Sequence, residues 1–167
     1  MGLRTQSLTF LGLLAGLTAM LQLGPVWLPG AGHLLAVCAT LPAAVAGAAH
    51  PARSSWYFLA AAVAVGLVSP QEMGVYITLT GPLGLMLGLT CDRPTWFSAG
   101  ASAAVLTGGL LLLPVLTGVY PWGGLERSWP TQALLSAYGA FALVYAALWQ
   151  VLFRRLWSKL RPRLVSR

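Results

Sequence analysis

Residues 97–117 read FSAGASAAVLTGGLLLLPVLT and contain no charged side chain. A helix rises about 1.5 Å per residue, so a helix of this length covers about 32 Å. The hydrocarbon core of a bilayer is about as thick. This stretch therefore predicts a helix that crosses a membrane.

Five further apolar runs occur in the chain, and short stretches rich in glycine and proline separate them. Together the runs predict six spans, at residues 5–23, 31–49, 54–68, 72–90, 97–117 and 130–153. The run 54–68 is the shortest, with 15 residues. We expect an all-α fold: a single domain over residues 1–167, built as a compact bundle of six transmembrane helices.

The composition fits the same interpretation. Hydrophobic residues make up 57% of the chain and charged residues only 8%, against about 25% charged residues in an ordinary soluble domain. Too little polar material remains to cover a surface that faces water. A cytosolic enzyme, a nucleic-acid-binding domain and a disordered linker are therefore excluded, although the net charge is +7.

The positions of the basic residues predict the topology. With six spans, nine of the ten Lys and Arg residues fall on one side of the membrane and only Arg127 falls on the other. Basic residues concentrate in cytoplasmic loops. Both termini are therefore expected in the cytoplasm, and the count supports the short third span independently of its hydropathy.

The last 14 residues, 154–167, follow the sixth span and carry six of the basic residues. Apolar residues recur at helical spacing among them. The pattern predicts that the last helix continues into a basic amphipathic segment, which lies against the anionic inner leaflet of the bilayer. A docking surface for a cytoplasmic partner is the alternative.

Residues for catalysis or metal binding are scarce. The only acids are Glu72, Asp92 and Glu126, and the two cysteines, Cys38 and Cys91, have no second ligand at metal-binding spacing. No paired carboxylates and no nucleophile–base pair occur at local spacing. We expect no enzyme, no metal site and no cofactor.

Polar and aromatic side chains gather instead at the predicted extracellular end of the bundle. The candidate ligand-binding residues there are Trp27, His33, Gln71, Glu72, Tyr76, Trp122, Arg127 and Trp129. Binding pockets combine apolar and aromatic walls with a few polar groups. The tryptophans could stack on a flat ring, and Glu72, His33 and Arg127 could bind its polar edges. The alternative is an interfacial aromatic belt, since Trp and Tyr concentrate at membrane surfaces.

Small residues recur in the first predicted span, at Gly12, Ala15, Gly16 and Ala19. Small residues at this spacing let two helix backbones approach closely in lipid. The stripe predicts either packing inside the bundle or a docking face for another protein.

The chain resembles the substrate-binding S components of energy-coupling factor (ECF) vitamin transporters. The resemblance rests on six spans with cytoplasmic termini, on the AGLTA stretch at 15–19, which looks like the family's AxxxA docking face, and on the glycine-rich TGPLGLMLG at 80–88. It implies a protein of the bacterial plasma membrane that captures a small, vitamin-like molecule outside the cell. It also implies docking through Ala15 and Ala19 on a transmembrane coupling subunit with cytoplasmic ATPases.

The resemblance does not identify the ligand-binding residues, because S components bind different cargoes with different side chains. This chain also has few polar groups in its expected pocket. A scaffold protein similar to MreD, without a ligand, is the main alternative. A ligand-binding membrane protein similar to the TspO group is a third, although that group has five spans.

Overall fold

The structure is a computed structural model that describes the backbone of residues 2–165 and the side chains of residues 6–125 and 127–162. Within these residues every regular element is a helix, so the expected all-α fold is confirmed. The side chains of Arg4, Glu126 and Arg163, and the whole of Arg167, lie outside the described part.

The helices follow one another with short connections. Their bounds are α1 Gly2–Gln22, α2 Gly24–Trp27, α3 Gly32–Cys38, α4 Thr40–Ala49, η1 Pro51–Arg53, α5 Ser54–Gly66, α6 Pro70–Val75, η2 Tyr76–Thr80, α7 Gly81–Leu89, α8 Thr95–Thr117, η3 Leu125–Ser128 and α9 Thr131–Val165. The predicted run 31–49 is therefore divided into α3 and α4, and the run 72–90 into α6, η2 and α7.

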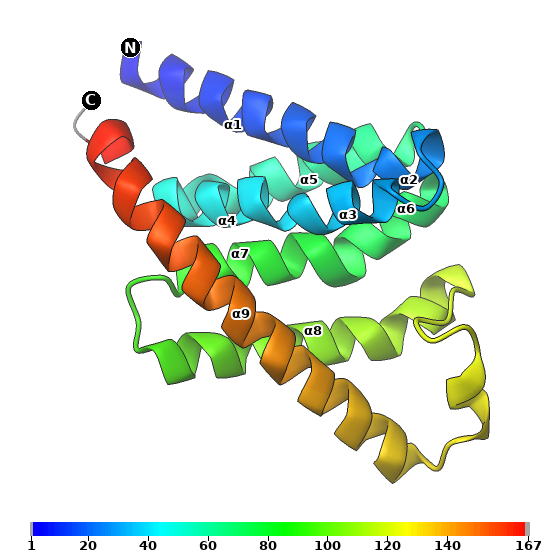
Figure 1. Cartoon of the computed structure of the whole chain (residues 1–167). Helices are drawn as coiled ribbons and strands as arrows, with labels where there is room; N and C mark the ends of the chain where they lie inside the picture. The colour runs from blue at the N-terminus through cyan, green and yellow to red at the C-terminus, as the bar shows by residue number, and fades with distance from the viewer. Residues whose placement is uncertain (1, 166–167) are drawn as a thin grey trace.

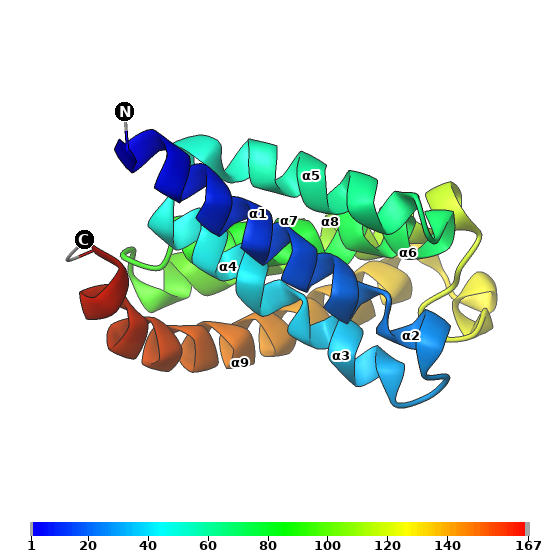
Figure 2. The same cartoon turned by 90° about the horizontal axis from the view of Figure 1, so that it is seen from above.

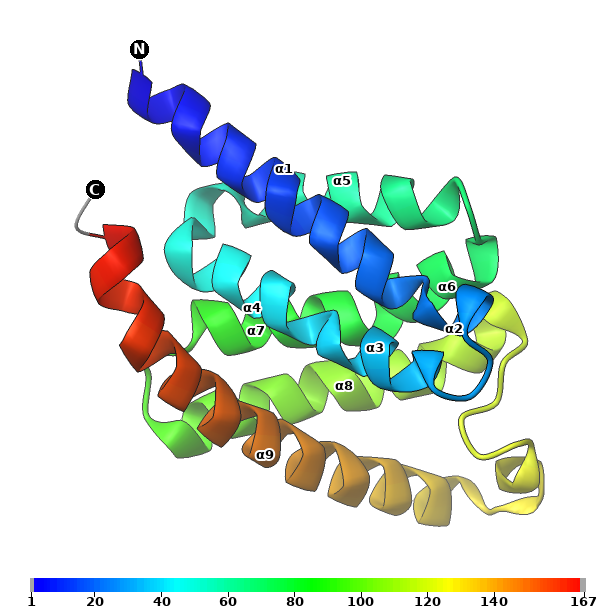
Figure 3. The ribbon, with the colours of Figure 1, turned by 45° about the horizontal axis from the view of Figure 1, so that its top comes forward.

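The helices lie side by side and form one bundle (Figure 1). The beginning of α1 and the end of α9 lie at the same end of the bundle, together with the α4–α5 and α7–α8 connections (Figure 3). We call this the terminal end. The α2–α3, α5–α6 and α8–α9 connections lie at the opposite end, which we call the distal end (Figure 2).

Four helical stretches among the described residues are long and apolar enough to cross a membrane: Gly32–Ala49, Pro70–Leu89, Thr95–Thr117 and Thr131–Pro162. The apolar part of α1, Gln6–Gln22, is shorter, and α5 has 13 residues, about 20 Å of helix. The chain therefore has the helices of a membrane protein, whereas six crossings remain a prediction.

The last helix is longer than the predicted span 130–153. It continues without interruption to Val165, because Phe153 and Trp157 are buried and pack into the same hydrophobic core as Leu87 on α7. The basic segment is thus the continuation of α9.

Large apolar side chains cover the outside of the bundle, including Leu13, Leu67 and Val115, whereas Gln22 and Gln150 are fully buried. A chain surrounded by lipid exposes its apolar groups and pairs its polar groups inside, because lipid offers no hydrogen bonds. The distribution of side chains is the one expected of a membrane protein.

Glycines bring the backbones of α4 and α7 together. A Cβ atom added at Gly84 would lie 2.5 Å from the carbonyl oxygen of Thr40, and one at Gly88 would lie 2.1 Å from that of Ala44. Neither position has room for a methyl group. Close approach of this kind favours helix association in lipid through van der Waals contacts.

We predict that Gly88→Ala lowers the melting temperature of the detergent-purified protein by several degrees, because overpacking costs about 1–3 kcal/mol. Gly100→Ala is the matched control, because Gly100 lies within α8 and an added Cβ there meets no heavy atom within 4 Å. Alanine has the higher helix propensity, so this variant should be at least as stable as the wild type. Equal melting temperatures for the two variants would contradict the tight α4–α7 contact.

Candidate functional site

An apolar cavity of about 290 Å³ lies in the distal half of the bundle. Five segments of the chain contribute to it: α3, the α6–α7 region, α8, the α8–α9 connection and α9. The residues that line it are His33, Ala36, Val37, Val75, Leu79, Thr80, Leu83, Leu106, Leu110, Pro121, Trp122, Phe141 and Tyr145. Small-molecule pockets start at about this volume.

The lining is aliphatic on one side and aromatic on the other. The aromatic side consists of Trp122, Phe141 and Tyr145. The ring of Trp122 lies 4.9 Å from the ring of Tyr138 and 5.3 Å from that of Trp129, centroid to centroid. These contacts fix the α8–α9 connection against the beginning of α9.

A second cavity, of about 300 Å³, lies between α8, α9 and their connection. Leu110 lines both cavities and thus separates them. The Arg127 guanidinium lies over the Tyr120 ring, 4.1 Å from its centroid, at the distance of a cation–π contact. Both residues line the second cavity.

The structure separates the eight candidate ligand-binding residues. His33 and Trp122 line the first cavity and Arg127 lines the second, while Trp129 supports Trp122. The other four lie elsewhere: Trp27 and Gln71 are exposed, Tyr76 is fully buried and Glu72 is half-buried, and neither cavity includes them in its lining.

Tyr76 packs inside the bundle rather than facing a cavity. Its ring stacks on that of Phe58, with a centroid distance of 5.4 Å. This contact joins the start of the π-helical turn η2 to α5. Tyr76 therefore belongs to the core between α5 and η2, together with Ala61.

Glu72 takes part in a chain of hydrogen bonds inside the bundle. Gln22 donates from Nε2 to Oε2 of Glu72 over 2.9 Å, and Thr80 donates from Oγ1 to Oε1 of Gln22 over 2.7 Å. The chain joins α1, α6 and η2. Because Thr80 also lines the first cavity, Gln22 fixes the direction of one of the few polar groups there.

Several lining residues were not candidates in the sequence analysis, among them Val75, Leu79, Leu83, Phe141 and Tyr145. The only signal in the sequence for any of them was the aromatic pair Phe141 and Tyr145 at i,i+4 spacing in the sixth run. That spacing is equally typical of packing inside a span.

The small residues of α1 differ in burial. Ala15 and Ala19 are buried within the bundle. Gly12 and Gly16 are exposed, and an added Cβ at either would meet no atom within 4 Å. A partner from outside would therefore contact the two glycines and not the alanines.

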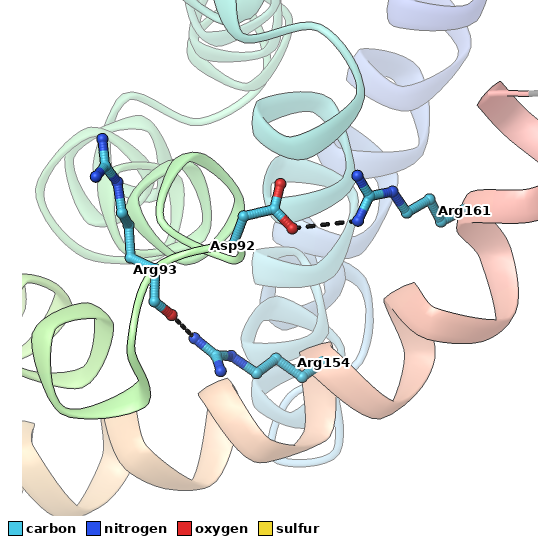
Figure 4. A network of polar contacts seen from close by, with 4 residues as sticks. All are labelled: Asp92, Arg93, Arg154 and Arg161. Carbon is cyan, nitrogen blue, oxygen red and sulfur yellow. Dashed lines mark hydrogen bonds and ion pairs between the residues drawn. The ribbon is translucent and has the colours of Figure 1, made fainter.

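At the terminal end, two arginines attach α9 to the α7–α8 connection (Figure 4). Arg154 donates from Nη1 to Oγ1 of Thr95 over 3.0 Å and from Nη2 to the carbonyl oxygen of Arg93. Arg161 forms an ion pair with Asp92 at 3.3 Å. Both members of this ion pair are exposed, so it contributes little to stability.

Two groups near this end, His50 and Cys91, have pKa values shifted toward their neutral forms. Burial lowers the pKa of His50, and the positive charge of Arg53 lowers it further. Burial raises the pKa of the Cys91 thiol, and the nearby Asp92 adds to the rise. A thiol with a raised pKa is a poor nucleophile.

Among the described residues no group of three or more metal-ligating side chains occurs.

The chain matches no protein-family model, no curated protein and no solved structure. Its function is therefore inferred from its own residues.

We predict that Gln22→Leu destabilises the protein by about 1–3 kcal/mol, because it leaves the Thr80 hydroxyl and the Glu72 carboxylate without their buried partner. The free energy of unfolding in mixed detergent micelles measures the effect. Thr107→Val is the control: the Thr107 hydroxyl bonds only to the Ala103 carbonyl of its own helix. If Gln22→Leu lowers the free energy of unfolding no more than Thr107→Val does, the hydrogen bonds of Gln22 have no stabilising role.

Proposed function

We propose that this protein is the substrate-capture subunit of an ECF-type importer in the bacterial plasma membrane. It binds a small molecule at the distal end of the bundle and docks through α1 on a transmembrane coupling subunit, whose ATPases drive uptake. The protein itself binds no nucleotide and catalyses no reaction.

The observation that supports this proposal most strongly is the apolar cavity at the distal end. Aromatic side chains from α9 and from the α8–α9 connection line it, together with few polar groups, as in sites for small organic ligands. Because the described ends of the chain lie at the opposite end of the bundle (Figure 1), a capture site on one side of the membrane leaves both termini on the other.

In the proposed topology the chain crosses the membrane six times. Four crossings use one helix each (α1, α5, α8 and α9), and two use consecutive helices (α3 with α4, and α6 with α7). Arg53, Arg93 and Arg154 then lie on the cytoplasmic side and Arg127 on the extracellular side, in accord with the positive-inside rule. Since α5 covers only about 20 Å, we expect the bilayer to be thinner beside it.

Docking is proposed for the outward face of α1. Gly12 and Gly16 expose their backbone there, and Leu13 and Leu17 flank them with exposed apolar side chains. A small-xxx-small stripe lets a partner helix approach closely. The glycines thus take the role that the resemblance gave to Ala15 and Ala19.

We predict that Gly16→Trp abolishes co-purification with a co-expressed ECF coupling subunit and its ATPases, because the indole holds the partner helix away. Gly100→Trp is the matched control, since Gly100 is also an exposed glycine on a helix with open space around it. Equal co-purification of both variants would contradict docking on this face.

The alternative is an MreD-like scaffold, and the exposed apolar face of α1 is the observation that favours it. A scaffold would bind partner proteins through this face with the cavity unused. Loss of assembly in Gly16→Trp, together with normal function of a variant whose cavity is filled, would favour the scaffold.

A further inference from the structure

The first cavity lies between two helices that diverge. Toward the distal end, α9 runs away from α3 (Figures 1 and 3). The two helices pack on different neighbours: α3 on α1 and α2, and α9 on α8. Val37 of α3 lines one edge of the cavity and Phe141 of α9 lines another.

These edges face the flank of the bundle. Val37 is 36% exposed and Phe141 is 45% exposed. The large apolar side chains beside them, Leu34 on α3 and Val144 on α9, are also exposed, as is typical of side chains that contact lipid. The space between α3 and α9 therefore leads from the cavity toward acyl chains.

Residues of the α8–α9 connection line the distal side of the cavity. Pro121 and Trp122 of the α8–α9 connection line the cavity there. Trp122 is in ring contact with both Tyr138 and Trp129, which hold its indole at the cavity wall, and His33 on α3 is the exposed lining residue at this end.

Among the residues whose side chains the structure describes, the lining contains no Asp, Glu, Lys or Arg, and His33 is its only titratable side chain apart from the Tyr145 phenol. Transfer of a charged group into such surroundings is costly unless an opposite charge pairs with it. Trp122, Phe141 and Tyr145 instead provide ring faces and edges for stacking. The lining thus favours a neutral molecule with a ring.

We propose that the capture site takes a neutral, ring-bearing molecule dissolved in the bilayer, which enters sideways between α3 and α9. This inference rests on the proposed capture function and identifies its substrate class and its route. Thr80 and His33 would bind the polar edge of the molecule, and the aromatic side chains would contact its ring.

Cysteine labelling in phosphatidylcholine–phosphatidylglycerol nanodiscs tests the route. In a Cys38→Ala/Cys91→Ala background, Val75→Cys reports from the cavity lining, Ser128→Cys from the exposed distal loop and Val144→Cys from the lipid-facing side of α9. The water-soluble cation MTSET and the lipid-soluble N-phenylmaleimide are the two probes.

We expect N-phenylmaleimide to label Val75→Cys within about tenfold of its rate at Val144→Cys, and MTSET to label it at least about 100-fold more slowly than Ser128→Cys, because a cation is excluded from the hydrocarbon. Fast labelling of Val75→Cys by MTSET, or labelling of Val144→Cys but not of Val75→Cys by N-phenylmaleimide, would overturn sideways entry. Fast MTSET labelling would mean that the cavity opens to water, and the capture function would stand. Failure of the capture function would instead appear as a cavity that reagents reach but that binds no ligand.

The ligand class is tested with two dyes that share one ring system, neutral N-phenyl-1-naphthylamine and its sulfonate 8-anilinonaphthalene-1-sulfonate. The neutral dye should raise the melting temperature of the protein by about 3 °C or more at saturation, and the sulfonate should not. Val75→Phe, which fills the cavity, should remove the shift. An equal effect of both dyes, or no effect of the neutral one, would overturn the proposal.

Discussion

The backbones of α4 and α7 lie in direct contact, and the rest of the bundle depends on this contact. Gly84 and Gly88 leave the space into which the carbonyl groups of α4 fit. Because the two helices approach so closely, Leu83 and Leu87 of α7 are held in the core with Ala44 of α4. Leu83 also lines the cavity, so the glycine contact sets the position of the cavity wall.

The polar groups inside the bundle act as a second constraint. A hydrogen bond lost in lipid cannot be replaced by one to water, and the Gln22 amide satisfies two helices at once by bonding to Glu72 and Thr80. Glu72 is thereby an internal structural partner. The same Gln22 amide also orients the Thr80 hydroxyl, which lines the cavity.

The helical class and the helix-forming runs could be predicted from the sequence, because uninterrupted apolar stretches and the glycine–proline breaks between them are local signals. The direction in which each side chain points could not. In a run that is apolar on all sides, the pattern does not fix the rotation of the helix about its axis. For this reason the sequence does not show that Gly12 is exposed while Ala15, its neighbour in the same predicted docking stripe, is buried, nor that Phe141 lines a cavity. His33 and Trp122, which do line the cavity, stand out in the sequence because they are polar or aromatic residues near helix ends; their binding of a ligand stays a prediction.

Native mass spectrometry of the protein released directly from its own membranes tests most directly whether the distal cavity captures one small molecule. We expect one adduct of small-molecule mass per chain in the wild type and none in Val75→Phe, in which a larger ring projects into the cavity. Spectra without an adduct in either protein, or with the same adduct in both, would contradict capture in this cavity.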